Sequence, residues 1–70
     1  MSRVADAAID VDVTILNTQM STLSTAVADL YSLKRRKDVM SDETAENAVY
    51  AAIRAEIMGA AQALAAHFTT

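Results

Sequence analysis

The sequence predicts an all-α protein: an antiparallel two-helix hairpin that assembles into a helical bundle or a larger oligomer. Three observations lead to this prediction. The 70 residues are 53% hydrophobic but include one glycine and no proline, a composition typical of helices rather than of a sheet with many turns. Apolar residues recur at steps of three and four in both halves of the chain. The register of this repeat changes near residue 40, which indicates that the chain folds back there.

Length and composition limit both the architecture and the chemistry. A chain of 70 residues forms one domain, residues 1–70, and its own core leaves only marginal stability. The absence of cysteine excludes a disulfide or a thiolate zinc site, and the single histidine, His67, excludes a multi-histidine cage. We therefore expect no cofactor and no metal, and we expect a second copy of the chain to supply the missing stability.

The first helix is expected over about residues 3–37, and a heptad repeat predicts its core face. Val13, Met20 and Val27 occupy one core position of this repeat. The whole stripe comprises Ile9, Val13, Leu16, Met20, Leu23, Val27 and Leu30, widened by Ala26 and Leu33. A second stripe beside it comprises Val4, Ala8, Val11 and Ile15. Two stripes predict that the first turns are covered on two sides.

Residues 9–15 also fit a strand, because apolar and polar residues alternate there and several are β-branched. With this strand, the order of elements resembles a ribbon-helix-helix repressor, which would imply a DNA-binding dimer. The resemblance covers element order alone. Asp10 and Asp12 would point from the ribbon toward phosphates, where such proteins need basic or neutral polar side chains. The helical interpretation stands first, because the same residues continue the heptad and form the second stripe.

The heptad fails after Leu33, so we expect a turn over about residues 38–41 and a second helix over about residues 42–68. Ser41 is the expected N-cap, because Asp42 and Glu43 follow it and suit the positive end of a helix. The turn contains no glycine or proline, which leaves one continuous bent helix as the alternative.

The second helix carries its own apolar stripe. The stripe comprises Tyr50, Ile53, Ile57, Ala60, Leu64 and His67, with Val49, Ala61 and Phe68 on its flank. Folding the chain about Met40 sets Leu23 against Ile57 and Met20 against Ala60. Because the large methionine would meet a small residue there, we expect the two helix axes to approach closely.

The charged residues indicate helix ends rather than a catalytic or nucleic-acid-binding site. The basic run Lys34–Lys37 suits the negative end of the first helix dipole, and the acids that follow cancel its charge. A net charge of -3 also disfavours binding to nucleic acid. The alternative is a partner-contact site at the tip of the hairpin. Its candidate residues are Tyr31, Arg35, Arg36 and Tyr50.

No group of residues suggests an enzyme or a metal site. Asp6, Asp10 and Asp12 match neither an EF-hand nor a Glu-x-x-His pair, and no nucleophile and base accompany His67. Residues 13–28 lack charge but are too polar to span a bilayer, and the N-terminus lacks the apolar core of a signal peptide. We expect a soluble protein in the cytoplasm or in a particle.

The expected function is self-association into a structural or assembly subunit, by analogy with small helical hairpins of phage particles, secretion apparatus and other polymers. A face rich in serine and threonine carries no charge, and the first helix outreaches the second, which leaves apolar turns without an intrachain partner. The interface candidates are Val4, Ala8, Ile9, Val11, Ile15, Thr18 and Thr22. The alternative is a small adaptor or chaperone that binds a partner helix.

Overall fold

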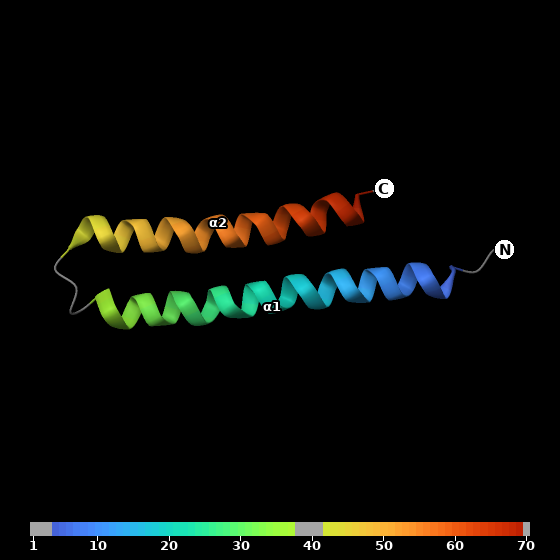
Figure 1. Cartoon of the computed structure of the whole chain (residues 1–70), viewed down its shortest axis with the longest axis horizontal. Coiled ribbons are helices and arrows are strands. Elements are labelled where there is room, and N and C mark those ends of the chain that lie inside the picture. The colour runs from blue at the N-terminus through green and yellow to red at the C-terminus, as the bar shows by residue number, and fades with distance from the viewer. Residues whose placement is uncertain (1–3, 38–41, 70) are drawn as a thin grey trace.

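The computed structural model describes residues 4–37 and 42–69, and it contains two helices. Helix α1 spans Asp6–Lys37 and helix α2 spans Glu43–Phe68. They run antiparallel, side by side, in a rod whose Cα extents are 62 × 17 × 13 Å (Figure 1). The predicted all-α hairpin is confirmed. One continuous bent helix, the alternative, is wrong because α2 packs back along α1.

Residues 9–15 belong to α1, so the interpretation as a strand, and with it the ribbon of a ribbon-helix-helix protein, is wrong. Local hydrogen bonds help to explain how β-branched residues are accommodated. The hydroxyl of Thr14 donates to the carbonyl of Asp10 at 2.9 Å, and Thr18 bonds Thr14 in the same way. These bonds place the polar atoms of threonine against the helix itself. The segment is also continuous with the rest of α1, and extending a helix that is already formed costs less than starting a new one.

Asp42, and not Ser41, caps the start of α2. Its backbone is extended, and its carboxylate Oδ1 accepts a hydrogen bond from the backbone N–H of Ala45 at 3.1 Å. A carboxylate at this position satisfies a free N–H and also carries negative charge beside the positive end of the helix dipole. Ser41, with the rest of the predicted turn over residues 38–41, lies outside the described residues.

The core of the hairpin lies toward its tip. Ala26, Leu33 and Ile53 are buried together, and Ala26 is only 1% exposed. Three partly buried residues pack against them: Leu30, Val49 and Ile57. The small Ala26 beside the large Ile53 permits close approach of the two helices, at a different level from the predicted contact of Met20 with Ala60. Farther along α2, Ala60 is also buried.

The face that α1 turns toward α2 differs from the predicted one. Met20 is 62% exposed and Val27 52% exposed, so the prediction that they fill the contact with α2 is wrong. The line along which α1 contacts α2, which we call the seam, lies one residue before the predicted core position of Met20 and Val27. On α1 it consists of Asp12, Gln19, Ala26 and Leu33. A stripe this wide cannot be covered by one helix, so α2 covers one edge of it and leaves the other edge bare.

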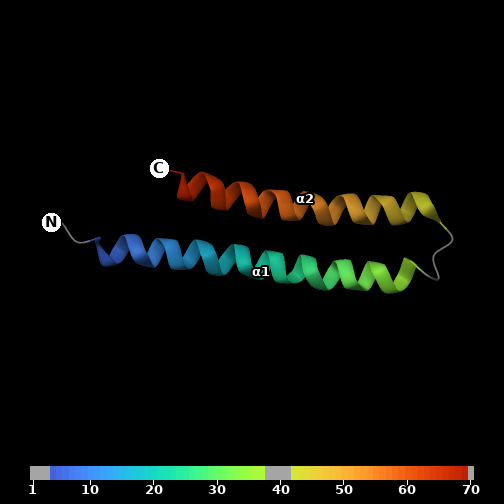
Figure 2. The same ribbon diagram turned by 180° about the vertical axis from the view of Figure 1, so that it is seen from behind.

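The register of the hairpin follows from one contact at its open end. Nε2 of His67 lies 2.6 Å from Oδ1 of Asp12. Two steps of seven residues, forward from Asp12 on α1 and backward from His67 on α2, set Ala26 opposite Ile53. This agrees with the burial of both residues in one cluster. This register is within one residue of the predicted fold about Met40. Helix α1 continues past the end of α2, as Figures 1 and 2 show.

Candidate interaction surfaces

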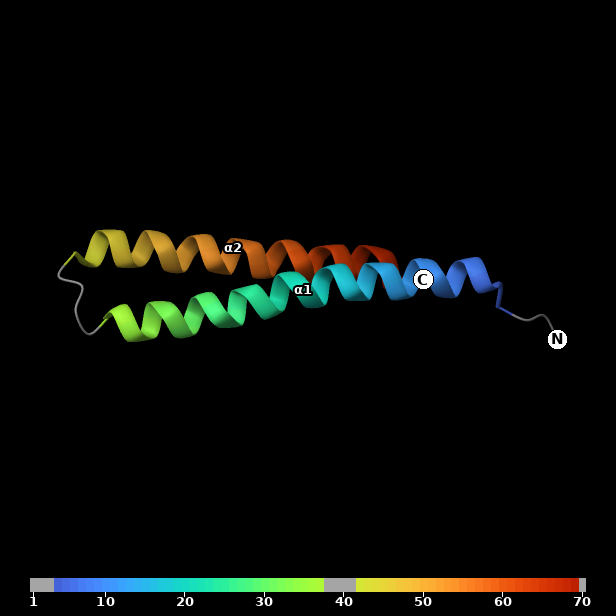
Figure 3. The ribbon, with the colours of Figure 1, turned by 60° about the horizontal axis from the view of Figure 1, so that its bottom comes forward.

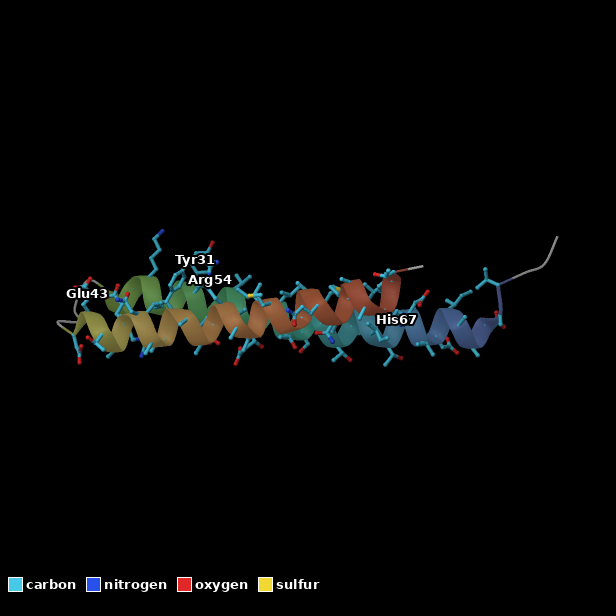
Figure 4. All side chains as sticks on the ribbon, turned by 90° about the horizontal axis from the view of Figure 1, so that it is seen from above. Tyr31, Glu43, Arg54 and His67 are labelled. Atoms are coloured by element: carbon cyan, nitrogen blue, oxygen red, sulfur yellow. The ribbon has the colours of Figure 1, made fainter. Side chains whose placement is uncertain are left out.

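One broad side of the hairpin carries most of its exposed large hydrophobic side chains. We call this side the apolar face. On α1 it consists of Ile9, Val13, Leu16, Met20, Val27 and Tyr31, and on α2 of Tyr50, Met58 and Phe68. Viewed along its edge, the hairpin has Tyr31 of α1 and Arg54 of α2 on the same side (Figure 4). The two helices therefore contribute to one continuous surface.

Helix geometry shows why these residues share a side. At about 100° per residue, Met20 and Val27 lie roughly a quarter turn from Ala26, the centre of the seam. On α2, Tyr50 and Met58 are displaced from Ile53 in the same rotational sense as Met20 and Val27 are from Ala26. Because α2 runs antiparallel to α1 and also faces it, this places all four residues on the same side of the hairpin. Of the eleven large hydrophobic residues that are exposed in the described part of the chain, nine belong to the apolar face.

The apolar face is hollowed near the tip of the hairpin. A shallow depression of about 290 Å³ lies between the helices, lined by Leu30, Tyr50, Arg54, Ile57 and Met58. Arg54 donates a hydrogen bond to the Tyr50 hydroxyl at 3.0 Å, and its guanidinium carbon lies 5.5 Å from the centre of the tyrosine ring. The charge of Arg54 thus has a partner within its own helix, which lowers the cost of covering this surface.

The opposite side of the hairpin, the Ser/Thr face, is built from small polar side chains. Its members on α1 are Thr14, Thr18, Ser21, Thr25 and Ser32. A shallow depression there is lined by Ser21, Thr22, Thr25 and Glu56. The hydroxyl hydrogens of Thr14, Thr18 and Thr22 are already donated to carbonyls four residues earlier. These three hydroxyls are therefore not free to donate to a partner.

The interface candidates from the sequence fall on different parts of the hairpin. Ile9 lies on the apolar face, whereas Thr18 and the half-buried Thr22 belong to the Ser/Thr side of α1. Within α1, the second stripe continues the line of the seam into the overhang, where Ala8 and Val11 are exposed and Ile15 is half-buried. Val4 is also exposed, but it precedes α1, which begins at Asp6 and not at about residue 3 as predicted. In Figure 3, the start of α1 again extends beyond the end of α2.

The residues proposed for the tip are divided between surfaces. Tyr31 and Tyr50 belong to the apolar face. Arg35 and Arg36 are exposed, and Arg36 lines a depression on the other side with Asp29 and Glu56. The structure thus separates the two aromatic residues from Arg36.

The chemistry of the described residues is limited. No three His, Cys, Asp or Glu side chains in residues 4–37 and 42–69 gather where they could hold a metal ion. The Asp12–His67 pair is polar and partly exposed, and the His67 ring also contacts Phe68 edge-to-face at 4.7 Å. Neither described helix is long and apolar enough to cross a membrane. Comparisons with family models, curated proteins and solved structures gave no match.

The sequence prediction named Ile9, Tyr31 and Tyr50 as contact candidates but assigned most of the apolar face to the seam. Val13, Leu16, Met20 and Val27 were expected to face α2. Met58 and Phe68 were outside the predicted stripe or on its flank. A signal was present: the combined apolar arc of α1, from Leu33 round to Met20, is wider than a single partner helix can cover.

Proposed function

We propose that this chain is a non-enzymatic structural or assembly subunit that associates with copies of itself into a helical bundle or a larger polymer. The observation that carries the proposal is the imbalance between buried and exposed apolar residues. In the described residues, four hydrophobic residues are buried, two of them alanines, and eleven large ones are exposed. A core this small offsets little of the entropy lost on ordering two long helices, so a further copy of the chain has to cover apolar surface.

The position of the apolar arc supports the same proposal. In a four-helix bundle each helix points its apolar residues at the bundle axis, which lies between its two neighbours. The arc of α1 runs from Leu33 and Ala26, which face α2, to Met20 and Val27, which face outward. The centre of this arc therefore points between α2 and the uncovered side of α1. The axis of a four-helix bundle would lie in that direction.

Capture of a partner helix is the second candidate function, and the depression beside Tyr50 and Met58 favours it. An amphipathic helix of another protein could insert an apolar side chain there, as helix-in-groove complexes do. The basic residues at the tip complement the dipole of α1, and neither candidate function depends on them.

Light scattering coupled to size-exclusion chromatography, with sedimentation velocity over a wide range of concentration, tests the leading proposal. We expect a defined particle of two or more chains, whose helix content by circular dichroism falls when dilution separates the copies. A compact and fully helical monomer at every concentration would contradict self-association and would favour the adaptor function.

A further inference from the structure

We infer that the apolar face is occupied by the same face of a second copy, arranged with the tip of one hairpin over the open end of the other. This inference rests on the proposed self-association and specifies its interface. The two hairpins form a four-helix bundle with a two-fold axis that crosses the middle of the face, beside Met20.

The apolar face is long enough to be covered by a second hairpin. From Ile9 to Tyr31 it extends about 33 Å along α1 at ~1.5 Å per residue, and the hairpin is 17 Å wide. The centre of the face is apolar, with Met20 and Met58 each about three-fifths exposed. A surface of this size and composition matches a second hairpin better than it matches a short peptide or a small ligand.

The decisive observation is that five of the six residues that α1 contributes to the apolar face are arranged symmetrically along the helix, whereas the sixth, Leu16, mirrors Ser24. A two-fold interface must be self-complementary, so each residue needs a partner at the mirrored position. Val13 and Val27 are equally distant from Met20 along the chain, and so are Ile9 and Tyr31. An antiparallel second copy centred on Met20 therefore sets Val13 over Val27 and Ile9 over Tyr31.

The exposed aromatic residues of α2 are also arranged symmetrically, about a centre that lies level with Met20 of α1. Tyr50 and Phe68 are equally distant from Gly59. The register given by the Asp12–His67 contact sets Gly59 level with Met20. One two-fold axis thus pairs both helices, with Tyr50 of each copy over Phe68 of the other and the large Met58 near the small, exposed Ala61.

Charge favours this orientation. Asp6, at the open end of α1, and Lys34, near the tip, are equally distant from Met20 along the chain. The antiparallel arrangement therefore sets Asp6 of each copy level with Lys34 of the other, so that opposite charges lie at the same level.

Cysteine cross-linking tests the inference directly, because the native chain contains no cysteine. Under mild oxidation, Met20→Cys should form a covalent dimer in high yield, and an equal mixture of Val13→Cys and Val27→Cys should cross-link far better than either variant alone. Thr25→Cys, on the Ser/Thr face, is the control and should stay largely unlinked. Efficient cross-linking of Val13→Cys alone would overturn the antiparallel arrangement.

A matched pair of charge variants tests the choice of face. The double variant Met20→Glu/Val27→Glu should raise the dissociation constant of the face-to-face pair at least about a hundredfold. Thr18→Glu/Thr25→Glu, with the same spacing on the opposite side, should leave it unchanged. If the threonine variant dissociates the particle and the other does not, self-association stands and this interface is wrong. If the wild type itself is a monomer, both the proposed function and the inference fail.

Discussion

Asp12 and His67 form the polar contact that joins the two helices at the open end of the seam. Both side chains retain access to water, at 48% and 27% exposure respectively, so solvent screens the interaction. The pair lies four turns or more from the apolar core around Ile53. Its main effect is to hold α2 in register against α1 where few apolar contacts are available.

A double-mutant cycle on Asp12→Asn and His67→Ala measures this contact. We expect a coupling of about 0.5 to 1 kcal/mol in the free energy of unfolding, because the pair is partly solvated. Urea unfolding followed by circular dichroism supplies the four stabilities, with protein concentration held constant. Asp10→Asn, on the outer side of α1, is the control and should show no coupling to His67→Ala. Equal coupling of Asp10 would contradict a specific contact.

The cap of α2 depends on one carboxylate oxygen, that of Asp42, bonded to the N–H of Ala45. Asp42→Ala should destabilise the hairpin by about 1 kcal/mol, since the N–H loses its acceptor and the helix dipole loses a nearby negative charge. Glu43→Gln removes a charge one residue later without removing the cap and should cost less. Thermal unfolding of both variants at one concentration makes the comparison, and equal losses would show that charge alone matters.

At the scale of the elements, each helix could be predicted from its repeat, and so could their antiparallel packing. The direction in which α1 faces could not. The sequence prediction assumed that α2 covers the centre of the apolar stripe of α1, and it therefore placed Met20 against Ala60. In the structure the small Ala26 lies in the seam, and Met20 faces outward. Sequence periodicity locates a stripe but does not say how many helices cover it.

Close packing along the seam has a measurable consequence at Ala60, which is 3% exposed. Replacing it with leucine should overpack the contact between the helices and cost about 1 to 3 kcal/mol of unfolding free energy. Ala51→Leu, at an exposed position of the same helix, should change stability far less because leucine and alanine are both good helix formers. Urea denaturation of the two variants decides the point. Wild-type stability of the Ala60 variant would contradict the tight seam.

At the scale of the whole molecule, the hairpin leaves two kinds of apolar surface bare. The apolar face runs along its broad side, whereas the overhang of α1 continues the line of the seam beyond α2. Thr69 stands level with Asp10 in the register of the hairpin, so residues 4–9 have no described residue of α2 opposite them. Two hairpins paired through their apolar faces would carry one such overhang at each end, which permits dimers to join end to end.

Deleting residues 1–8 should therefore lower the oligomeric state while the hairpin stays largely helical. The deletion removes Val4, which is 68% exposed and precedes α1, and Ala8, which lies on the line of the seam. It leaves Met20 and the rest of the apolar face intact, so Met20→Cys should still cross-link in the shortened chain. Light scattering gives the particle mass, and circular dichroism gives the helix content. Deletion of residues 1–3 alone is the control, because it keeps Val4 and Ala8 and should preserve the mass. If the longer deletion also leaves the mass unchanged, the overhang makes no contact between copies, and any assembly larger than the dimer must use the Ser/Thr face.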